Sequence, residues 1–422
     1  MTNNLDFQTL CVHGKREIED NGPVINPIVQ SASYHLNDTS SAADLFNLKK
    51  EGNIYSRINN PTIQNLEEKI ALLEGGVGAL GVSSGQSAIL TTVLTICKAG
   101  DHILSSSSLY GGTYTLFNNT LRAMGIDVTF FSPKDTKEDI NKLCKPITKI
   151  LYCESIGNPG LEVVDIDKFA SVAKKNGIPL VVDNTFATPY LFRPIERGAN
   201  IVVHSATKYL SGHGNSIAGL IIDGGNFKWD NGRFDDLINP DSGYGGMKFY
   251  EVFGKAAFIA KARAKVLRDV GCCLSPMNGF LVNQGIETLS LRMDRHSDNA
   301  SILYQFLDKH PKVKWVNYPK YNNCSYKTYF DRGYGGMLTF GIIGGKKAGE
   351  EFINSLKVAI HVANVGDTRT MVIHPGSTTH GQLTEKEQRS SGVDPDLIRV
   401  SVGIENIEDI INDFRNALGK DV

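Results

Sequence analysis

Residues 149–184 read KILYCESIGNPGLEVVDIDKFASVAKKNGIPLVVDN. We expect a strand over residues 149–155, a helix over 165–177 that ends at a glycine, and a second strand over 179–184. The two strands are nearly continuous apolar runs, which is typical of strands buried on both faces of a parallel sheet. A strand–helix–strand unit of this length predicts a right-handed crossover within a three-layer α/β domain.

The same alternation continues on both sides of this unit. A helix over residues 61–74 is marked by a proline in its first turn and by a Gly-Gly pair at its end. Apolar runs predict further strands over residues 78–82, 102–106, 127–131 and 200–206. Helices are expected between them, over residues 84–100, 113–125 and 137–144.

The character of the sequence changes after the last of these strands. Residues 224–246 are rich in Gly, Asn and Asp, which predicts a long surface insertion. Long helices are expected over 248–271 and about 285–309, followed by a mixture of strands and helices. We therefore expect an α/β fold with three parts: an N-terminal arm over residues 1–60, a mostly parallel α/β domain over 61–263, and a smaller α+β C-terminal domain over 264–422.

Composition narrows the class of protein. The 422 residues carry a formal net charge of −1, with 41% hydrophobic and 21% charged residues. This is the balance of a globular protein, and it gives no basic patch for nucleic acid or an anionic membrane. No apolar run is long enough to span a membrane, and the first residues lack the pattern of a secretory signal.

The cysteines and histidines indicate the compartment of the protein and whether it binds a metal. The seven cysteines contain no C-x-x-C pair, which indicates free thiols in a reducing compartment, so we expect a cytoplasmic protein. The ten histidines form no familiar ligand spacing, and we expect no metal site.

Polar residues follow the predicted strands at the edge where open α/β sheets bind ligands. The most informative segment is residues 204–214, HSATKYLSGHG, in which Lys208 lies next to the hydroxyls of Ser205 and Thr207. A lysine is usually a solvated surface group, but lysine is also the side chain that forms a Schiff base with an aldehyde. Hydroxyls that bind a phosphate, next to such a lysine, are what pyridoxal 5'-phosphate requires.

That cofactor also needs a carboxylate beside its pyridine nitrogen and donors for its phosphate. Asp183, at the end of the strand before, is the candidate carboxylate, although an aspartate there also caps loops. Gly85 and Gln86 open a helix whose backbone N–H groups suit an anion. Tyr110 follows another strand end and is placed to stack on a ring, although a lone tyrosine is more often structural.

With these residues in place, the sequence resembles the Cys/Met-metabolism family of pyridoxal-phosphate enzymes, which have the type I, aspartate aminotransferase-like fold. The resemblance runs from about residue 25 to 415 and is closest to the sulfhydrylase branch, whose members act on O-acetylhomoserine. The matching segments are YSRINNPTIQNLEEKIALLEGG, SSGQSAI, SLYGGTY, ESIGNP, VDNTFATPY, HSATKYLSGHG, HPGSTTH and RVSVGIE.

The resemblance implies roles around the cofactor. Lys208 holds the cofactor and moves protons, Asp183 pairs with the pyridine nitrogen, and Tyr110 stacks on the ring and assists the leaving group. Asn158 lies near the ring hydroxyl. The residues expected to bind the phosphate are Gly85, Gln86, Ser205 and Thr207.

The resemblance also implies contacts to the substrate and between subunits. Arg399 binds the substrate α-carboxylate with the two-point geometry of a guanidinium. Asn364 stands where many relatives have a serine that touches the same carboxylate, so its role is open. Tyr55 and Arg57 reach the phosphate of a neighbouring subunit, with Tyr55 also near the substrate. A homotetramer built as two dimers is implied.

The activity implied is γ-replacement: O-acetyl-L-homoserine and sulfide, or a thiol, give L-homocysteine, or methionine, and acetate. Three alternatives stay open: a γ-lyase acting on methionine or cystathionine, a sulfhydrylase using O-acetylserine or O-succinylhomoserine, and a relative without catalysis. Gly112 favours synthesis, because methionine γ-lyases typically carry a cysteine there; the alternative interpretation is that this glycine only shapes the turn.

Overall fold

The computed structural model describes residues 5–15, 21–321, 329–378, 381 and 392–419. The end of the HPGSTTH segment and Cys324 lie outside these residues. The six described cysteines have free thiols. None of the described helices is long and apolar enough to cross a membrane.

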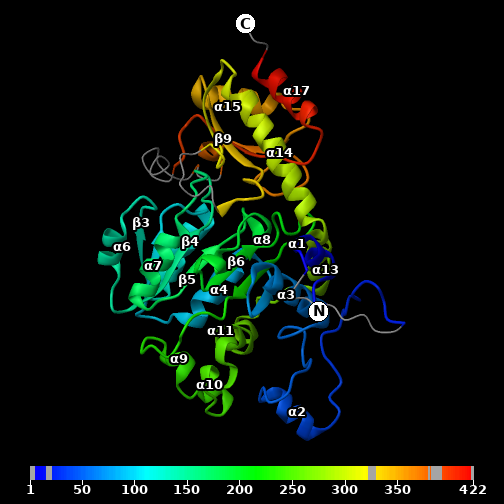
Figure 1. Ribbon diagram of the computed structural model, residues 1–422, viewed down its shortest axis with the longest axis vertical. Helices are drawn as coiled ribbons and strands as arrows, with labels where there is room; N and C mark the ends of the chain where they lie inside the picture. The colour runs from blue at the N-terminus through cyan, green and yellow to red at the C-terminus, as the bar shows by residue number, and fades with distance from the viewer. Residues whose placement is uncertain (1–4, 16–20, 322–328, 379–380, 382–391, 420–422) are drawn as a thin grey trace.

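A seven-stranded sheet forms the centre of the larger part of the chain (Figure 1). Its order is β1-β7-β6-β5-β4-β2-β3, and the five strands from β6 to β3 run parallel. The strands are β1 Gly78–Val82, β2 His102–Ser106, β3 Asp127–Phe131, β4 Thr148–Glu154, β5 Leu180–Asp183, β6 Ile201–Ser205 and β7 Gly219–Asp223. The prediction of a mostly parallel sheet is confirmed. The sequence did not lead us to expect β7, which lies antiparallel between β1 and β6.

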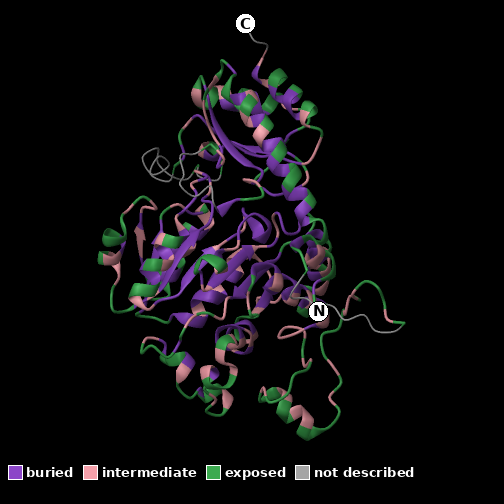
Figure 2. Ribbon diagram, viewed as in Figure 1, coloured by how far each residue is buried: buried purple, intermediate pink, exposed green. Residues whose placement is uncertain are grey.

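Both faces of this sheet are buried (Figure 2). Along β5, for example, Val182 belongs to one hydrophobic cluster and Val181 to the other, because successive side chains point to opposite faces. The helices that cover the sheet include α3 Pro61–Glu74, α4 Gly85–Ile96, α6 Lys137–Leu143 and α7 Ile166–Asn176. The helix expected over 113–125 begins earlier, as α5 Gly111–Thr115, and continues as a π-helical turn over Leu116–Leu121.

A second, five-stranded sheet lies at the other end of the molecule (Figure 1). Its order is β10-β11-β12-β9-β8, formed by β8 Val313–Asn317, β9 Met337–Ile342, β10 Ile360–His361, β11 Met371–Ile373 and β12 Leu397–Ser401. Helices α15 Gly345–Ser355 and α17 Ile407–Leu418 pack with it in a third hydrophobic cluster. This is the expected α+β part.

The long C-terminal helices differ from the sequence prediction. The helix expected over about 285–309 is present but begins later, as α14 Leu289–Asp308, and Thr288 separates it from the preceding helix α13 Pro276–Glu287. On α14, Met293 packs in the core of the first sheet and Ala300 in that of the second, so the core changes within this helix. The boundary at residue 263 stays a prediction.

The segment over 248–271 is also broken. It forms α10 Phe249–Phe253, a 3₁₀ turn over Gly254–Ala256, α11 Ala257–Lys261, a π-helical turn over Ala262–Leu267 and α12 Arg268–Val270. The break falls at Gly254, whose positive φ of 52° interrupts helical geometry.

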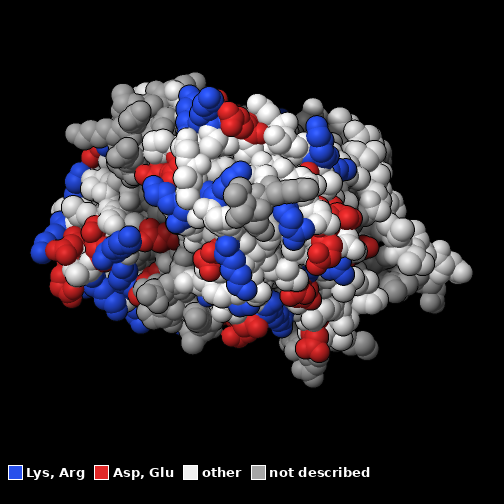
Figure 3. All heavy atoms as spheres, turned by 90° about the horizontal axis from the view of Figure 1, so that it is seen from above, with Lys and Arg blue, Asp and Glu red and all other residues white. Residues whose placement is uncertain are grey.

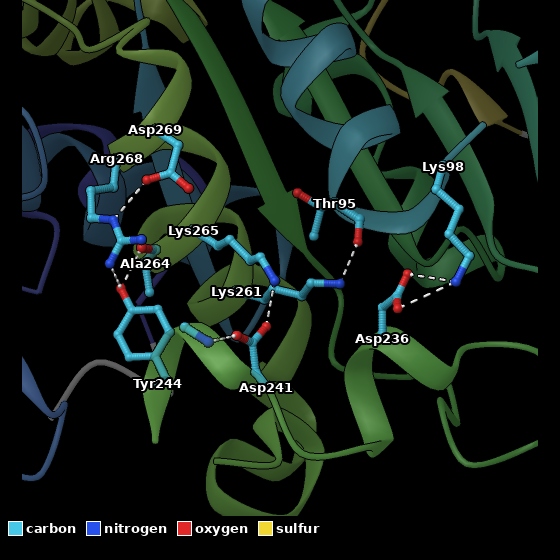
Figure 4. A network of polar contacts seen from close by, with 11 residues as sticks. Thr95, Lys98, Asp236, Asp241, Tyr244, Lys261, Ala264, Lys265, Arg268 and Asp269 are labelled. Carbon is cyan, nitrogen blue, oxygen red and sulfur yellow. Dashed lines mark hydrogen bonds and ion pairs between the residues drawn. The ribbon is translucent and has the colours of Figure 1, made fainter. Parts of the chain in front are cut away.

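Residues 224–246 are anchored more firmly than a surface insertion implies. Trp229 and Phe234 are buried in the second hydrophobic cluster, because their rings pack against Phe258 and against each other. Tyr244 is fixed to the following helical segment, where its hydroxyl donates to the Ala264 carbonyl and accepts from Arg268 Nη1 (Figure 4). The prediction of an exposed segment is therefore wrong for the aromatic residues.

The N-terminal residues divide into two kinds. Helix α1 Phe7–His13 packs on the large core, with Phe7 and Cys11 buried. Helix α2 Thr39–Phe46 has no buried residue and lies on an extension that leaves the body of the molecule (Figures 1 and 2). Only this second stretch has the character of an arm.

Acidic and basic side chains are mixed on the surface seen in Figure 3. This mixture agrees with the formal net charge of −1.

Candidate active site

A cavity of about 350 Å³ opens at the carboxyl ends of β4, β5 and β6. This is the edge at which parallel α/β sheets bind ligands. The cavity brings together ten of the twelve predicted site residues: Gly85, Gln86, Tyr110, Asn158, Asp183, Ser205, Thr207, Lys208, Asn364 and Arg399.

Lys208 comes three residues after the end of β6. Its Nζ donates a hydrogen bond to Asn364 Oδ1 at 2.5 Å. Burial and the nearby positive charge of Arg399 lower the pKa of Lys208 to about 8. About a tenth of the amine is therefore neutral and nucleophilic at pH 7, far more than for an ordinary lysine.

This pKa leads to a testable expectation for the apoprotein. A lowered pKa means that the amine is neutral above pH 8, so its rate of reaction with an aldehyde should rise about tenfold from pH 7 and level off near pH 9. Stopped-flow absorbance with pyridoxal phosphate measures this rate, with Nα-acetyl-lysine as the reference for the pH dependence of the aldehyde itself. A rate that keeps rising through pH 10 would mean that Lys208 is an ordinary lysine.

Asp183 ends β5 and points into the cavity. Its Oδ1 accepts hydrogen bonds from the backbone N–H and the hydroxyl of Thr185, at 3.0 and 2.5 Å. Burial raises the pKa of Asp183, and the bonds from Thr185 oppose that rise. A cationic ring nitrogen against this carboxylate would stabilise its charged form, as the cofactor expected from the sequence requires.

The expected phosphate site lies where α4 begins beside the end of β6. A Cβ on Gly85 would lie 2.7 Å from Ser205 Cβ, so the glycine is required for this close approach. Ser84 caps the helix by accepting from Ser87 N, and the first N–H groups of a helix have no partner within it. These N–H groups suit a phosphate. The Thr207 hydroxyl already donates to and accepts from the backbone of Ala218.

Arg399 supplies a buried positive charge to the cavity. It lies in β12 of the small sheet, is 6% exposed, and donates from Nη1 to Asn158 Oδ1 at 3.1 Å. Burial lowers its pKa to about 10. Among the described residues, no carboxylate forms an ion pair with this guanidinium. A buried cation without an internal counter-ion is a binding site for an anionic group of a ligand.

Tyr110 precedes α5 and is 48% exposed at the mouth of the cavity. A Cβ on Gly112 would lie 2.5 Å from Tyr110 Cε1 and 2.8 Å from Gln86 Nε2. A side chain at position 112 would therefore meet the ends of the Tyr110 and Gln86 side chains, which would have to shift. The glycine leaves room for both side chains in their present positions, in addition to any role in the turn.

Two predicted residues lie outside the cavity. Tyr55 and Arg57 do not line it, and Arg57 Nη1 instead donates to the Arg268 carbonyl. The guanidinium of Arg57 also lies over the Tyr55 ring, 5.2 Å from its centroid. Their contact with a neighbouring subunit stays a prediction.

The structure adds two residues that we did not assign from the sequence. Glu154 and Thr185 line the cavity, and each follows or ends an apolar strand. The expectation that polar residues at strand ends line the site, which identified Asp183, also covers both of these positions. Their roles were missed because hydrogen-bond partners from other loops are not visible in a sequence.

Comparisons with known proteins identify the family of the chain. The family model described as Cys/Met metabolism PLP-dependent enzyme matches residues 8–419. The chain is 48% identical to an O-acetyl-L-homoserine sulfhydrylase of Leptospira meyeri, over 99% of this chain and 98% of that one. It is 47% identical to a homocysteine synthase of Schizosaccharomyces pombe, over 98% of each chain.

A solved structure is similar over the whole chain. It is that of a putative O-acetylhomoserine (thiol)-lyase from Campylobacter jejuni, which contains a pyridoxyl-lysine monophosphate. The TM-score is 0.94 with 35% identity, over 98% of this chain and 100% of that one. The chain therefore belongs to the Cys/Met-metabolism family of enzymes that depend on pyridoxal 5'-phosphate.

Proposed function

We propose that this enzyme catalyses γ-replacement, in which O-acetyl-L-homoserine and sulfide give L-homocysteine and acetate. The observation that carries the proposal is the placement of Lys208 and the unpaired cation of Arg399 in one cavity with Asp183. The names of the relatives, O-acetyl-L-homoserine sulfhydrylase and homocysteine synthase, support this choice of substrate and product.

Each residue of the cavity has a separate role in the proposed reaction. When bound, the cofactor supplies an aldehyde and an electron sink. Arg399 binds the substrate α-carboxylate and so orients the amino acid. Lys208, with a pKa lowered to about 8, takes and returns protons at Cα and Cβ of the substrate. Asp183 holds the ring nitrogen, and the start of α4 with Ser205 holds the phosphate.

The region beside Tyr110 suits a small, neutral leaving group. The C–O bond at Cγ breaks to release acetate, and a C–S bond forms at the same carbon. Gly112 keeps the Tyr110 ring in place and adds no side chain of its own. Among the cavity residues, Lys208 and Arg399 are the cations, and both already have roles, so a succinyl carboxylate would have no partner.

Steady-state turnover tests the proposal. We expect fast homocysteine formation from O-acetylhomoserine with sulfide, slow use of O-succinylhomoserine and O-phosphohomoserine, and little 2-oxobutyrate from methionine. Each substrate is measured with and without sulfide, and acetate and 2-oxobutyrate are assayed separately. Release of 2-oxobutyrate from methionine at the rate of the sulfide reaction would identify a γ-lyase instead.

We also propose that the working enzyme is a cytoplasmic homotetramer, built as two dimers, in which Tyr55 and Arg57 complete the phosphate site of the neighbouring subunit. The arm supports this, since its apolar side chains are not covered within the chain. Val24, Ile25 and Phe46 are 80%, 61% and 57% exposed. Burial of such side chains against a second copy would stabilise a two-fold interface.

Mixed dimers test the shared site. Subunits with Arg57→Ala and subunits with Lys208→Ala are each expected to be inactive as homodimers. Mixing them should restore activity, because one of the two sites in a mixed dimer combines an intact Lys208 with an intact Arg57. Activity is measured on heterodimers isolated with two different affinity tags. No recovery in such heterodimers would mean that each site is built within one chain.

A further inference from the structure

Glu154 occupies a central place in the cavity that the reaction described above does not use. It ends β4, lines the cavity and is 6% exposed. Its Oε1 accepts the backbone N–H of Tyr110 at 2.6 Å, and its carboxylate also accepts the backbone N–H of Asn158. These two N–H groups come from different loops, one after β2 and one after β4.

The two loops carry groups with separate roles. The first carries the ring of Tyr110, and the second carries Asn158, whose Oδ1 accepts from Arg399 Nη1 at 3.1 Å. One carboxylate is therefore connected to the aromatic ring on one side and, through Asn158, to the guanidinium on the other. A buried carboxyl group that accepts from two backbone N–H groups fixes the separation of the loops that carry them, because each N–H would lose a buried partner if its loop moved.

We propose that Glu154 is a positioning residue that holds Tyr110 and, through Asn158, Arg399 at a fixed separation, and so sets the pose of the amino-acid substrate. This inference rests on the proposed function. A substrate held by its α-carboxylate at Arg399 presents its γ-carbon near Tyr110 only if both loops keep their places, because small misplacements of a reacting group are costly.

Position and charge support this role over a contribution to folding alone. Glu154 is paired in register with Asp183 on the neighbouring strand, so two carboxylates lie side by side at the edge of the cavity. Burial and the charge of Asp183 raise the pKa of Glu154, and the two backbone N–H groups oppose that rise. Two neighbouring buried acids repel each other when both are charged, so this arrangement is costly for folding and agrees with a role in the cavity.

The test compares two isosteric changes in the holoenzyme. Glu154→Gln replaces one of the two carboxyl oxygens with an amide NH2 group, which cannot accept from a backbone N–H. Asp413→Asn is the matched control: Asp413 is 5% exposed and accepts the backbone N–H groups of Lys357, Val358 and Ala359, but it lies in the layer of the small sheet and does not line the cavity. Both variants lose the same kind of interaction.

We expect Glu154→Gln to raise KM for O-acetylhomoserine about tenfold or more while KM for sulfide changes little, since hydrogen bonds to charged groups have effects of this size. The visible circular dichroism of the bound cofactor should also change, because the Tyr110 ring moves. Asp413→Asn should lower the melting temperature and leave both readouts unchanged. Equal KM values and spectra in Glu154→Gln and wild type would overturn the inference.

Further variants distinguish a failure of the proposed function from a failure of the role inferred for Glu154. If Glu154→Gln does not fold, Glu154→Asp keeps the charge but is one methylene too short, and the same rise in KM is expected. Arg399→Lys with unchanged KM would contradict the proposed function itself. A raised KM in Arg399→Lys with a wild-type KM and spectrum in the folded Glu154 variant would contradict only the role of Glu154. When Glu154→Gln and Arg399→Lys are combined in one variant, we expect their effects on KM to be less than additive, because the two residues act on the same substrate group.

Discussion

Replacing Lys208 with alanine is expected to leave the fold intact and remove nearly all turnover. Among the described residues, the Lys208 side chain makes one hydrogen bond, to Asn364, so its loss costs little stability. Turnover should fall because, in the proposed function, the same amine attaches the cofactor and moves protons, and proton transfer alone contributes about 10² to 10⁴ in rate. The variant should also lose the visible absorbance of a covalently attached cofactor.

Lys261→Ala is the matched control for this prediction. Lys261 is also buried, at 4% exposure, and burial lowers its pKa to about 8 as well. Its Nζ donates to the Thr95 carbonyl, next to the inserted segment and outside the cavity (Figure 4). We expect normal absorbance and turnover in this variant. Unchanged visible absorbance and turnover in Lys208→Ala would exclude Lys208 as the cofactor lysine.

Arg399→Lys is expected to lower kcat/KM for O-acetylhomoserine by about 30- to 1000-fold, equivalent to about 2–4 kcal/mol. An ammonium keeps the charge but does not offer two parallel N–H donors to a carboxylate. The shorter reach also removes the bond to Asn158, so the loop of that residue loses a partner. Steady-state kinetics at saturating sulfide measure the effect.

Arg233→Lys is the control that tests whether a loss of kcat/KM is specific to an arginine of the cavity. Arg233 donates to the backbone carbonyls of Pro146 and Thr148, at the opposite end of β4 from the active site. This change should leave kcat/KM within about twofold, as is usual for substitutions away from a site. If Arg399→Lys has the same small effect, the α-carboxylate is bound elsewhere.

Much of the fold was predictable because its strands are buried on both faces. Continuous apolar runs such as residues 180–182 are well explained as buried strands once helices of the right length separate them. Strand β7 was missed because its short apolar run lies between glycine-rich segments, and strand direction cannot be inferred from periodicity. The start of the helix expected over 285–309 was placed too early. The apolar pattern runs on from α13 into α14, so the sequence did not reveal the break between the two helices at Thr288.

The site was predictable where its residues end strands and only by resemblance elsewhere. Lys208 and Asp183 follow neighbouring parallel strands, so their proximity follows from the sheet. Arg399 comes from β12 of the small sheet and Asn364 from the segment between β10 and β11, and no local pattern connects them with Lys208. Glu154 was visible as a strand end, but its bond to Tyr110 depends on how two loops meet.

The antiparallel position of β7 has a consequence for the order in which the enzyme forms during synthesis. β1 is an edge strand whose hydrogen-bonded neighbour is β7, although the two are far apart in the chain. While β2 to β6 emerge from the ribosome they find partners among themselves, but β1 stays unpaired until residue 223 is available. Non-local pairing of this kind is slow and leaves an apolar strand open to aggregation. The start of α4 follows β1 closely, so in a nascent chain that ends before β7 this helix begins beside a strand without a partner, although Asp183 and Lys208 have already been synthesised.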